Sequence, residues 1–594
     1  MLVTLDFETY YDSKLSLTKM TTMDYVNHDN FKVWGVGIKI DDEPAEWYGE
    51  EEARSALQEI DWSDATLLCH NTPFDGYILT QHYGLIPSYY LDTAAIGRAL
   101  YPYQSARLKD IAIRLWPDDD RMRKGEELAD AKGHFDLSEE LEQKIAGYYI
   151  QDVELTWAIY KNLTKRMPLD ELDIIDLTCR MFCEPKLFVD VPALKKYRNS
   201  EARRSKETIE ASGILRAVLA SNKQFSELLE SMGITVPTKV SPTTGKNIPA
   251  LGKNDKAFLQ LQKMYPQHNK IWEARTAVKS RINETRAQRF IDAAHDDGTI
   301  SVPLKYYAAH TGRFGGTEKI NMQNMPRNSP IREALCAPDG KLIFVADLSN
   351  IEARMLAWLA GQEDLLQQFR DGEDIYSNFA SKIYGKPINK KDHPTERFVG
   401  KTAILGLGYG MGATKFKNTL NMGIEQSEAV SIISTYRSTY FHIPTLWQRL
   451  EHKLASTILP ATYEEWGCLT FTDRSIVLPN TLALKYPDLR FYKGGLIYDG
   501  RNSIENTWGG KITENVVQAL SRLVVTDALL RIEKDQNLDV TPVLTVHDEI
   551  VLIGPKEEPC ATMDKLIAHM CVPPTWAPDL PLDAEGGYDN RYSK

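Results

Sequence analysis

Short apolar runs alternate with amphipathic stretches at the start of the chain. Residues 2–8, 31–40 and 65–70 are apolar runs of strand length, and residues 105–116 carry apolar side chains at helical spacing. Strands that alternate with helices are typical of an α/β unit. The pattern therefore predicts a first α/β domain over residues 1–165.

Acidic residues stand at the ends of apolar strands in the C-terminal half. Residues 341–347 form an apolar strand that ends on Asp347. Apolar runs lie on both sides of His547, Asp548 and Glu549, which predicts a hairpin with the acids at or near its turn. A charged turn between two apolar strands is a common structural feature, so this segment by itself leaves a purely structural role open.

Composition is that of a globular protein. Of the 594 residues, 43% are hydrophobic and 26% are charged, which argues against a mostly disordered chain. No apolar run is long enough to cross a bilayer, and the N-terminus lacks the features of a signal peptide, so we expect a cytoplasmic protein with no membrane partner. The seven cysteines are scattered without a CxxC pair, which predicts reduced packing residues.

The net charge of −12 hides a basic region. Residues 166–300 are mostly helical in pattern, with a loop predicted at residues 238–249 from its Pro, Gly and Thr. Residues 239–290 carry seven Lys and four Arg against three acids, a net of +8, whereas residues 41–64 hold ten acids against one Arg and predict a solvated acidic face. Three lysines on or just beyond the loop are placed for phosphate contacts, namely Lys239, Lys246 and Lys253. A basic surface without a ligand is the alternative.

A first group of candidate metal ligands lies in the N-terminal domain. Asp6 and Glu8 share one face of a strand, and Tyr148 and Asp152 share one face of a helix. Asp75 follows another apolar strand. Four carboxylates and a tyrosine suit two Mg²⁺ or Mn²⁺ ions that activate a water for phosphodiester hydrolysis. A surface strand with ordinary acids is the alternative.

A second group combines two cations on one helix stripe. A spacing of four residues places side chains along one stripe of a helix, namely Arg397, Lys401, Leu405 and Tyr409. Pro394 helps to start this helix. Two cations one turn apart repel each other, but together they suit the oxygens of a triphosphate. An amphipathic helix with solvated bases is the alternative.

The first group resembles the DEDD-type 3′–5′ exonucleases with a tyrosine in the third motif. Asp6 and Glu8 match motif one, Asn71 and Asp75 match motif two, and Tyr148 and Asp152 match motif three. The resemblance implies a ribonuclease H-like domain in which the four acids hold two metal ions and Tyr148 orients the attacking water.

The later motifs resemble the polymerase domain of family A DNA polymerases, the group that contains bacterial DNA polymerase I. Motif A matches at residues 347–354, motif B at 397–410 and motif C at 547–549, with further matches at 311–313, 321–326 and 510–522. The resemblance implies an α/β and α+β multidomain fold, with a right hand after the exonuclease domain. We expect the linker and thumb at residues 166–300, the palm at 301–372 and 461–594, and the fingers at 373–460.

The resemblance also implies roles at the nucleotide. Asp347 and Asp548 would hold two Mg²⁺ ions, with Mn²⁺ as an alternative in both metal sites. Arg397 and Lys401 would bind the triphosphate, and Lys401 is also placed to give a proton to the leaving pyrophosphate. The remaining assignments are Glu352 as a steric gate against a 2′-hydroxyl, Tyr409 at the template-base position, and His547 and Glu549 at the primer terminus.

Further residues are implied to contact DNA. Arg313 and Gln518 would read minor-groove acceptors that correct base pairs share. Gln323 and Asn324 belong to the upstream motif. The basic segment with Lys239, Lys246 and Lys253 falls where the family has the thumb that grips the duplex.

Leu405 departs from the family pattern, which has Phe or Tyr at this position. A ring there packs against the incoming sugar, so the handling of 3′-modified nucleotides does not carry over.

The sequence predicts a DNA polymerase with a proofreading 3′–5′ exonuclease. Its expected partners are primer–template DNA and dNTPs, and we expect a monomer. The stretch at residues 509–519 and the short N-terminus, which implies no 5′-nuclease domain, point to a phage enzyme acting in the host cytoplasm. Two alternatives are a single-subunit RNA polymerase, disfavoured by Glu352, and a DNA-binding factor with a vestigial polymerase site. Processivity partners, strand displacement and any preference for modified bases stay undetermined.

Overall fold

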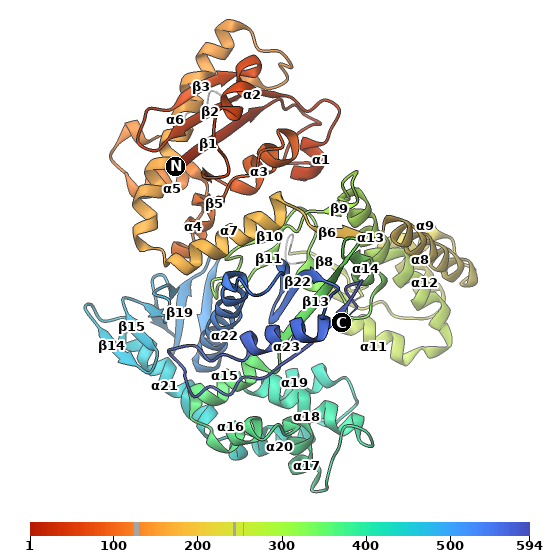
Figure 1. Cartoon of the computed structure of the whole chain (residues 1–594). Helices are drawn as coiled ribbons and strands as arrows, with labels where there is room; N and C mark the ends of the chain where they lie inside the picture. The colour runs from red at the N-terminus through yellow and green to blue at the C-terminus, as the bar shows by residue number, and fades with distance from the viewer. Residues whose placement is uncertain (124–129, 242–244, 254, 594) are drawn as a thin grey trace.

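The computed structural model describes residues 1–123, 130–241, 245–253 and 255–593. Figure 1 shows an N-terminal α/β domain stacked on a body made of a central sheet with a helical arm on one side and a helical lobe below. We call these three parts of the body palm, thumb and fingers, after the parts expected from the sequence.

A five-stranded mixed sheet forms the centre of the N-terminal domain. Its strand order is β3-β2-β1-β4-β5, with β1 antiparallel to β2 and parallel to β4. The strands are β1 (Leu2–Thr9), β2 (Val33–Ile40), β3 (Glu46–Gly49), β4 (Thr66–Cys69) and β5 (Tyr89–Asp92). Alternation along β1 buries Val3, Leu5 and Phe7 and leaves Asp6 and Glu8 half-buried on the other face.

Helices accompany this sheet. They are α1 (Thr22–Val26), α2 (Glu50–Gln58), α3 (Thr72–Tyr77), α4 (Thr93–Leu100), α5 (Leu108–Leu115) and α6 (Glu139–Leu163). Of these, α5 and α6 lie where helical runs were predicted around residues 105–116 and 148–152. Ser138 caps the long helix α6 by accepting a hydrogen bond from the Leu141 N–H. All ten acids of residues 41–64 are exposed, which confirms the solvated acidic face.

The thumb is a helical unit with its own hydrophobic core. Its helices are α8 (Val191–Ala211), α9 (Arg216–Ala220), α10 (Asn222–Ser231), α11 (Lys256–Met264), α12 (Asn269–Lys279) and α13 (Ile282–Asp292). Phe225, Phe258 and Trp272 meet edge to face in this separate core.

The predicted loop at residues 238–249 is instead a short hairpin. Strands β7 (Thr238–Val240) and β8 (Asn247–Pro249) pair antiparallel, because extended, partly β-branched residues lie at both ends of the segment. Residues 242–244 lie outside the described residues.

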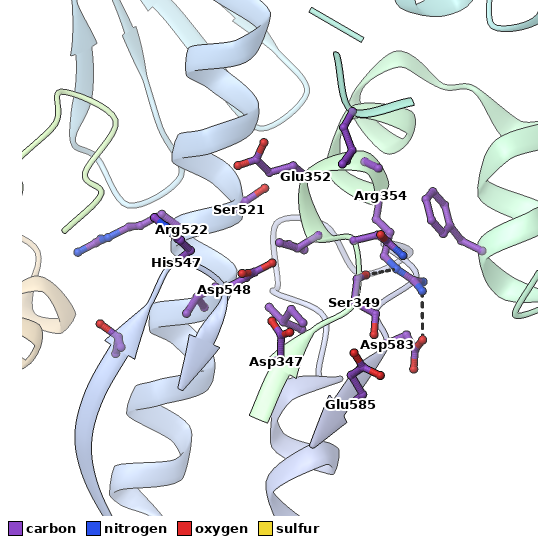
Figure 2. A pocket seen from close by; sticks show the side chains of 18 of the residues that line it. Asp347, Ser349, Glu352, Arg354, Ser521, Arg522, His547, Asp548, Asp583 and Glu585 are labelled. Atoms are coloured by element: carbon purple, nitrogen blue, oxygen red, sulfur yellow. Dashed lines mark hydrogen bonds and ion pairs between the residues drawn. The ribbon is translucent and has the colours of Figure 1, made fainter. Parts of the chain in front are cut away.

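The palm is an antiparallel sheet of order β21-β22-β13-β23. Its strands are β13 (Lys341–Leu348), β21 (Thr541–Val546), β22 (Glu549–Pro555) and β23 (Ala584–Asp589), and it packs with α15 (Ile351–Ala360), α22 (Gly509–Lys534) and α23 (Pro559–Met570). Figure 2 shows the ends of β13 and of the β21–β22 hairpin meeting at one cavity. The hairpin predicted around residues 547–549 is thereby confirmed.

The fingers are helices between the two parts of the palm sequence. They are α17 (Ile375–Tyr384), α18 (Pro394–Leu407), α19 (Ala413–Leu420), α20 (Gln426–Thr439) and α21 (His442–Ser456). Helix α16 (Glu363–Arg370) precedes them, within the segment expected to be palm. Residues 463–507 then form two small sheets that are separate from the palm sheet. Their strands are β14 (Tyr463–Trp466), β15 (Leu469–Thr472), β16 (Ser475–Val477) and β17 (Ala483–Lys485), followed by β18 (Arg490–Tyr492), β19 (Gly495–Asp499) and β20 (Ile504–Thr507).

Short elements join the thumb to the palm. A three-stranded sheet of order β12-β6-β9 combines β6 (Leu187–Val189), β9 (Thr299–Ile300) and β12 (Leu335–Cys336). The others are β10 (Leu304–Lys305), β11 (Gly315–Gly316) and α14 (Pro330–Glu333).

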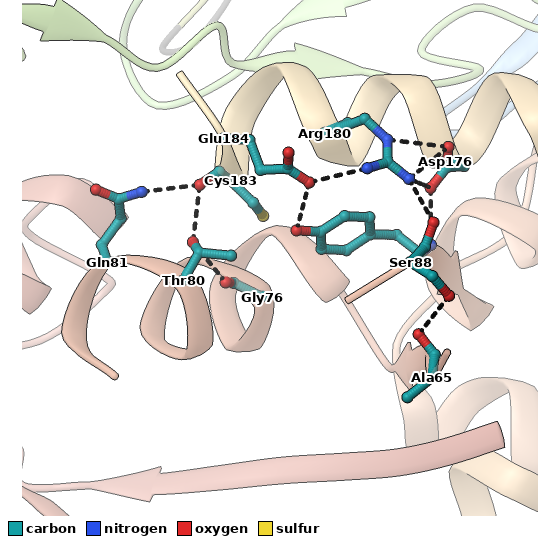
Figure 3. Close-up of polar contacts among 10 residues, drawn as sticks. Ala65, Gly76, Thr80, Gln81, Ser88, Asp176, Arg180, Cys183 and Glu184 are labelled. Carbon is teal, nitrogen blue, oxygen red and sulfur yellow. Dashed lines mark hydrogen bonds and ion pairs between the residues drawn. The ribbon is translucent and has the colours of Figure 1, made fainter. Parts of the chain in front are cut away.

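Helix α7 (Leu169–Cys183) fastens the N-terminal domain to the palm. Figure 3 shows its C-terminal end against the N-terminal domain, where Thr80 and Gln81 donate to the Cys183 carbonyl at 2.7 and 2.9 Å and Arg180 donates to the Ser88 carbonyl at 2.8 Å. Near its other end, Glu171 is buried and pairs with Arg522 of α22. One helix therefore contacts both the N-terminal domain and the palm.

Among the described residues, no helix is both long and apolar enough to cross a membrane. The seven cysteines are free thiols, as predicted. Cys69, Cys179 and Cys183 are buried packing residues, whereas Cys560 is exposed.

Candidate functional site

The two palm acids meet where adjacent strands end. Asp347 lies near the end of β13, and Asp548 lies in the turn between β21 and β22, where His547 adopts a left-handed conformation with φ of 57°. The Leu348 N–H donates to the Asp548 carbonyl at 3.1 Å, which ties the two segments together. Both side chains line a cavity of about 880 Å³ (Figure 2). The structure thus brings together two carboxylates that are remote from each other in the sequence.

The electrostatics of this pair suit a cation. Burial raises the pKa of Asp548 above its ordinary value, because the charged form loses water. Arg327 reaches Asp347 with Nη2 at 3.4 Å from Oδ2, and Glu585 of β23 pairs in register with Asp347. Paired carboxylate oxygens at the wall of an open cavity are ligands that Mg²⁺ prefers. The donor set therefore fits the expected divalent metal.

Glu549 occupies a different environment from the one expected for a primer contact. It is buried, and both of its carboxylate oxygens accept from Arg332 Nη2, at 3.1 and 3.0 Å. Tyr592 donates a further hydrogen bond to the carboxylate, and the Arg332 guanidinium carbon lies 3.7 Å from the centroid of the Tyr592 ring. The carboxylate is engaged inside the palm, so its side chain is not presented to DNA in this structure.

Helix α18 carries the two cations of motif B. Pro394 is its first residue, as predicted. Lys401 and Leu405 line the cavity, whereas Arg397 lies beside it and pairs with Asp374 through Nε and Nη2 at 2.6 and 3.1 Å. Helix α18 ends at Leu407, so the expected stripe stops before Tyr409.

Tyr409 instead joins a cluster around the expected sugar gate. Gly410 follows it with φ of 75°, which turns the chain away from the helix axis. The Tyr409 hydroxyl donates to Glu352 Oε2 at 3.3 Å, and Arg313 pairs with Glu352 Oε1. Burial raises the pKa of Tyr409 and lowers that of Arg313. Glu352 is thus held from two sides.

The other expected DNA contacts differ in exposure. Gln323 is buried and supports motif C, since its side chain donates to the Thr545 carbonyl and accepts from the His547 N–H at 3.2 Å. Its neighbour Asn324 is exposed. Gln518 is half-buried on α22, with Nε2 at 3.4 Å from Glu514 Oε1. Gln323 therefore supports the turn that carries Asp548 rather than presenting its amide to solvent.

The N-terminal domain brings three of its four acids into one cluster. Asp6, Glu8 and Asp152 each offer a carboxylate oxygen, and these atoms lie within 4.8 Å of one another. Asp75 lies on α3 and accepts a hydrogen bond from the Phe7 N–H at 3.0 Å. Burial, and then the charge of Asp6, raise the pKa of Asp75 far above its ordinary value. A divalent ion would relieve this repulsion, so the donor set fits the predicted metal site.

Tyr148 is buried on α6, one turn before Asp152. Its ring meets Tyr149 edge to face, with centroids 5.2 Å apart. Tyr148 therefore lies on the helix that also carries Asp152 of the carboxylate cluster, as the spacing in the sequence predicted.

The thumb lysines lie on and beside the β7–β8 hairpin. Lys239 forms an ion pair with Asp255 at 2.7 Å. Lys246 and Lys253 are exposed, and neither forms an ion pair with another residue of the described ranges. The last two lysines are therefore the more available for phosphate contacts.

Several residues near the cavity were not found by sequence reasoning. Asp374 and Tyr376 contact the motif B cations, while Arg332 and Tyr592 hold motif C. None lies within motif A, B or C, and their partners are remote in sequence. A carboxylate placed at a helix start, as Asp374 is, signals an N-cap and gives no hint of Arg397.

The chain belongs to DNA polymerase family A, since the model of that family matches residues 193–594. Like the proteins it resembles, it is a DNA-directed DNA polymerase, which disfavours the RNA polymerase alternative. It is 25% identical to the DNA polymerase of Bacillus phage SP02, in an alignment that covers 100% of this chain and 99% of the relative.

Two further relatives extend the comparison to bacteria. The thermostable DNA polymerase I of Thermus thermophilus is 27% identical over 57% of this chain and 39% of its own length. The fold is similar to the POL domain of Pol1 from M. smegmatis in complex with DNA primer-template and dNTP, with a TM-score of 0.69, 18% identity, and coverage of 100% of this chain and 95% of that one. The similarity to the Pol1 POL domain shows the fold alone.

Proposed function

We propose that the chain extends a DNA primer by template-directed phosphoryl transfer at the palm cavity. The observation that carries the proposal is the meeting of Asp347 and Asp548 at a cavity that Lys401 of the fingers also lines. Asp347 and Asp548 would hold two Mg²⁺ ions, which supply a lowered pKa for the primer 3′-hydroxyl and charge neutralisation at the phosphates.

The fingers would bind the triphosphate of the dNTP. Arg397 would offer a planar fork and Lys401 a point charge to its oxygens, and Lys401 would give a proton to the leaving pyrophosphate. Glu352, held by Arg313 and Tyr409, would exclude a 2′-hydroxyl from the sugar position.

Other side chains would orient the DNA. Arg313 and Gln518 would read the minor groove, and Asn324 and His547 would lie along the primer strand. Lys246 and Lys253 of the thumb would bind phosphates of the duplex. Gln323 supports the same region through motif C.

We also propose that the N-terminal domain is a 3′–5′ proofreading exonuclease. Asp6, Glu8, Asp75 and Asp152 would hold two Mg²⁺ ions, and Tyr148 would orient the attacking water. Clustering of three of these acids within 4.8 Å supports this assignment.

A second cavity supports the proposal that a single DNA strand passes between the polymerase site and the exonuclease site. It measures about 930 Å³ and lies between the N-terminal domain and the polymerase body, beside Asn71. The described residues that line it include no carboxylate and five cations, namely Arg98, Arg107, Lys109, Lys305 and Arg501. Burial, and then repulsion from Arg98 and Arg501, lower the pKa of Lys305. A phosphate backbone would relieve this repulsion.

In its biological setting we propose a monomeric enzyme that replicates a phage genome in the host cytoplasm. Similarity to the phage SP02 polymerase along the whole chain supports this setting.

Separate variants of the two metal sites test the proposed activities. Asp347→Ala should abolish primer extension and leave degradation of single-stranded DNA intact. Asp6→Ala/Glu8→Ala should abolish degradation of single-stranded DNA and leave primer extension intact. Extension that survives Asp347→Ala would refute the polymerase site and would favour a vestigial one.

A further inference from the structure

Asp374 stands at the start of α17 and has two kinds of partner. It is the N-cap residue, and its side chain accepts hydrogen bonds from the backbone N–H groups of Tyr376 at 3.2 Å and Ser377 at 3.4 Å. The Ser377 hydroxyl donates to the same carboxylate at 2.7 Å. These contacts hold the carboxylate in one orientation.

The same carboxylate also forms an ion pair with Arg397 of α18. Arg397 donates through Nε at 2.6 Å and through Nη2 at 3.1 Å, a two-point contact along one edge of the guanidinium. The Tyr376 ring lies under the group, with 5.2 Å between its centroid and the Arg397 guanidinium carbon. Arg397 is therefore fixed along one edge and over one face.

The other edge of Arg397 is left for a ligand. A guanidinium carries five N–H donors, and in the described part of the chain Nη1 of Arg397 has no hydrogen-bond partner. Tyr376 and Lys401 line the polymerase cavity beside it, and the Lys401 ammonium lies 5.9 Å from the Tyr376 ring centroid. The Arg397 guanidinium and the Lys401 ammonium thus lie near the same tyrosine ring.

We infer that Asp374 is a positioning residue for the incoming nucleotide: it holds Arg397 by the Nε edge so that the Nη1 edge is ready for phosphate oxygens. The inference rests on the proposed role of Arg397 in binding the triphosphate. An arginine side chain loses much rotamer freedom when it binds, and a group already fixed by Asp374 and Tyr376 loses less. Asp374 therefore favours nucleotide binding without contacting the nucleotide.

Asp374→Asn is the variant that tests this role. Asparagine is an equally good N-cap, so α17 keeps its start while Arg397 loses its charged partner. In single-turnover incorporation of one dNTP, we expect the apparent dissociation constant of the nucleotide to rise about fivefold, the effect of a partly exposed ion pair, with the maximal rate within about twofold of the parent. Glu396→Gln is the matched control, because it removes a charge from α18 and breaks the pair with Lys386 without touching Arg397.

A double-mutant cycle with Arg397→Ala separates this inference from the proposed function. Asp374→Asn should add nothing to the nucleotide affinity in the Arg397→Ala background. A full effect in that background, an unchanged affinity in the single variant, or tighter nucleotide binding would each overturn the positioning role while leaving the polymerase assignment intact. If Arg397→Ala itself leaves the affinity unchanged, the proposed role of Arg397 fails, and this inference fails with it.

Discussion

Replacing Glu549 by glutamine is expected to destabilise the palm more than it weakens DNA binding. The neutral amide would leave the Arg332 cation without a counter-charge in a site where the side chains of Arg332 and Glu549 are only 3% and 5% exposed. Removing one partner of a buried pair costs about 3 to 5 kcal/mol. This range already includes the weakening of the hydrogen bond that the Tyr592 hydroxyl donates to the Glu549 carboxylate. A domain is typically stable by about 5 to 15 kcal/mol, so this is a large fraction of the total.

Urea unfolding followed by intrinsic fluorescence, together with DNA binding measured on the folded variant, provides the assay. Glu557→Gln is the matched control, since Glu557 is exposed and close to the end of the same hairpin. The double replacement Arg332→Met/Glu549→Leu should recover much of the lost stability, because no charge is then left buried. A Glu549→Gln variant that unfolds like the parent but binds primer–template at least about tenfold more weakly, a difference of about 1.4 kcal/mol, would refute the structural role.

Three further predictions concern the sugar pocket, the thumb and the palm helix α22. Leu405→Tyr should raise dideoxynucleotide incorporation in primer extension, because a ring would then pack against the sugar; unchanged chain termination would contradict this. Lys246→Ala/Lys253→Ala should lower the slope of log affinity against log salt by about 2, measured by DNA titration over a range of salt concentrations, and an unaltered slope would exclude phosphate contacts. Burial raises the pKa of Asp527 to about 6, so the folded state binds a proton more tightly than the unfolded state, and the free energy of unfolding should fall as pH rises from about 4 to 6. Asp527→Asn should abolish that fall and raise the free energy of unfolding at pH 7 by up to about 3 kcal/mol in urea titrations; a pH profile identical to the parent's would count against it.

Local periodicity accounts for most of what the sequence predicted correctly. Alternation along β1 placed Asp6 and Glu8 on one face, and the helical repeat placed Tyr148 one turn from Asp152. The hairpin that carries Asp548 was likewise visible as two apolar runs around a polar turn. These features depend on neighbours within a few residues, which is why the sequence was sufficient.

Where the prediction failed, contacts between remote segments decided the outcome. The side chain of Glu549 follows the same strand alternation as its neighbours, yet its partner Arg332 lies 217 residues earlier. The partner of Arg397, Asp374, lies 23 residues before it, and no repeat of strand or helix connects the two. Even Tyr409 was misplaced, because α18 ends at Leu407 and the chain then turns.

The sequence by itself indicated the family, the carboxylates proposed as metal ligands and the cations proposed to bind the triphosphate, since each depends on residue type and short-range spacing. The tertiary structure alone decided which polar groups face the cavity and which are used inside the protein. The physical reason is that a buried charge requires a partner, and the partner is supplied by whichever segment the fold brings alongside.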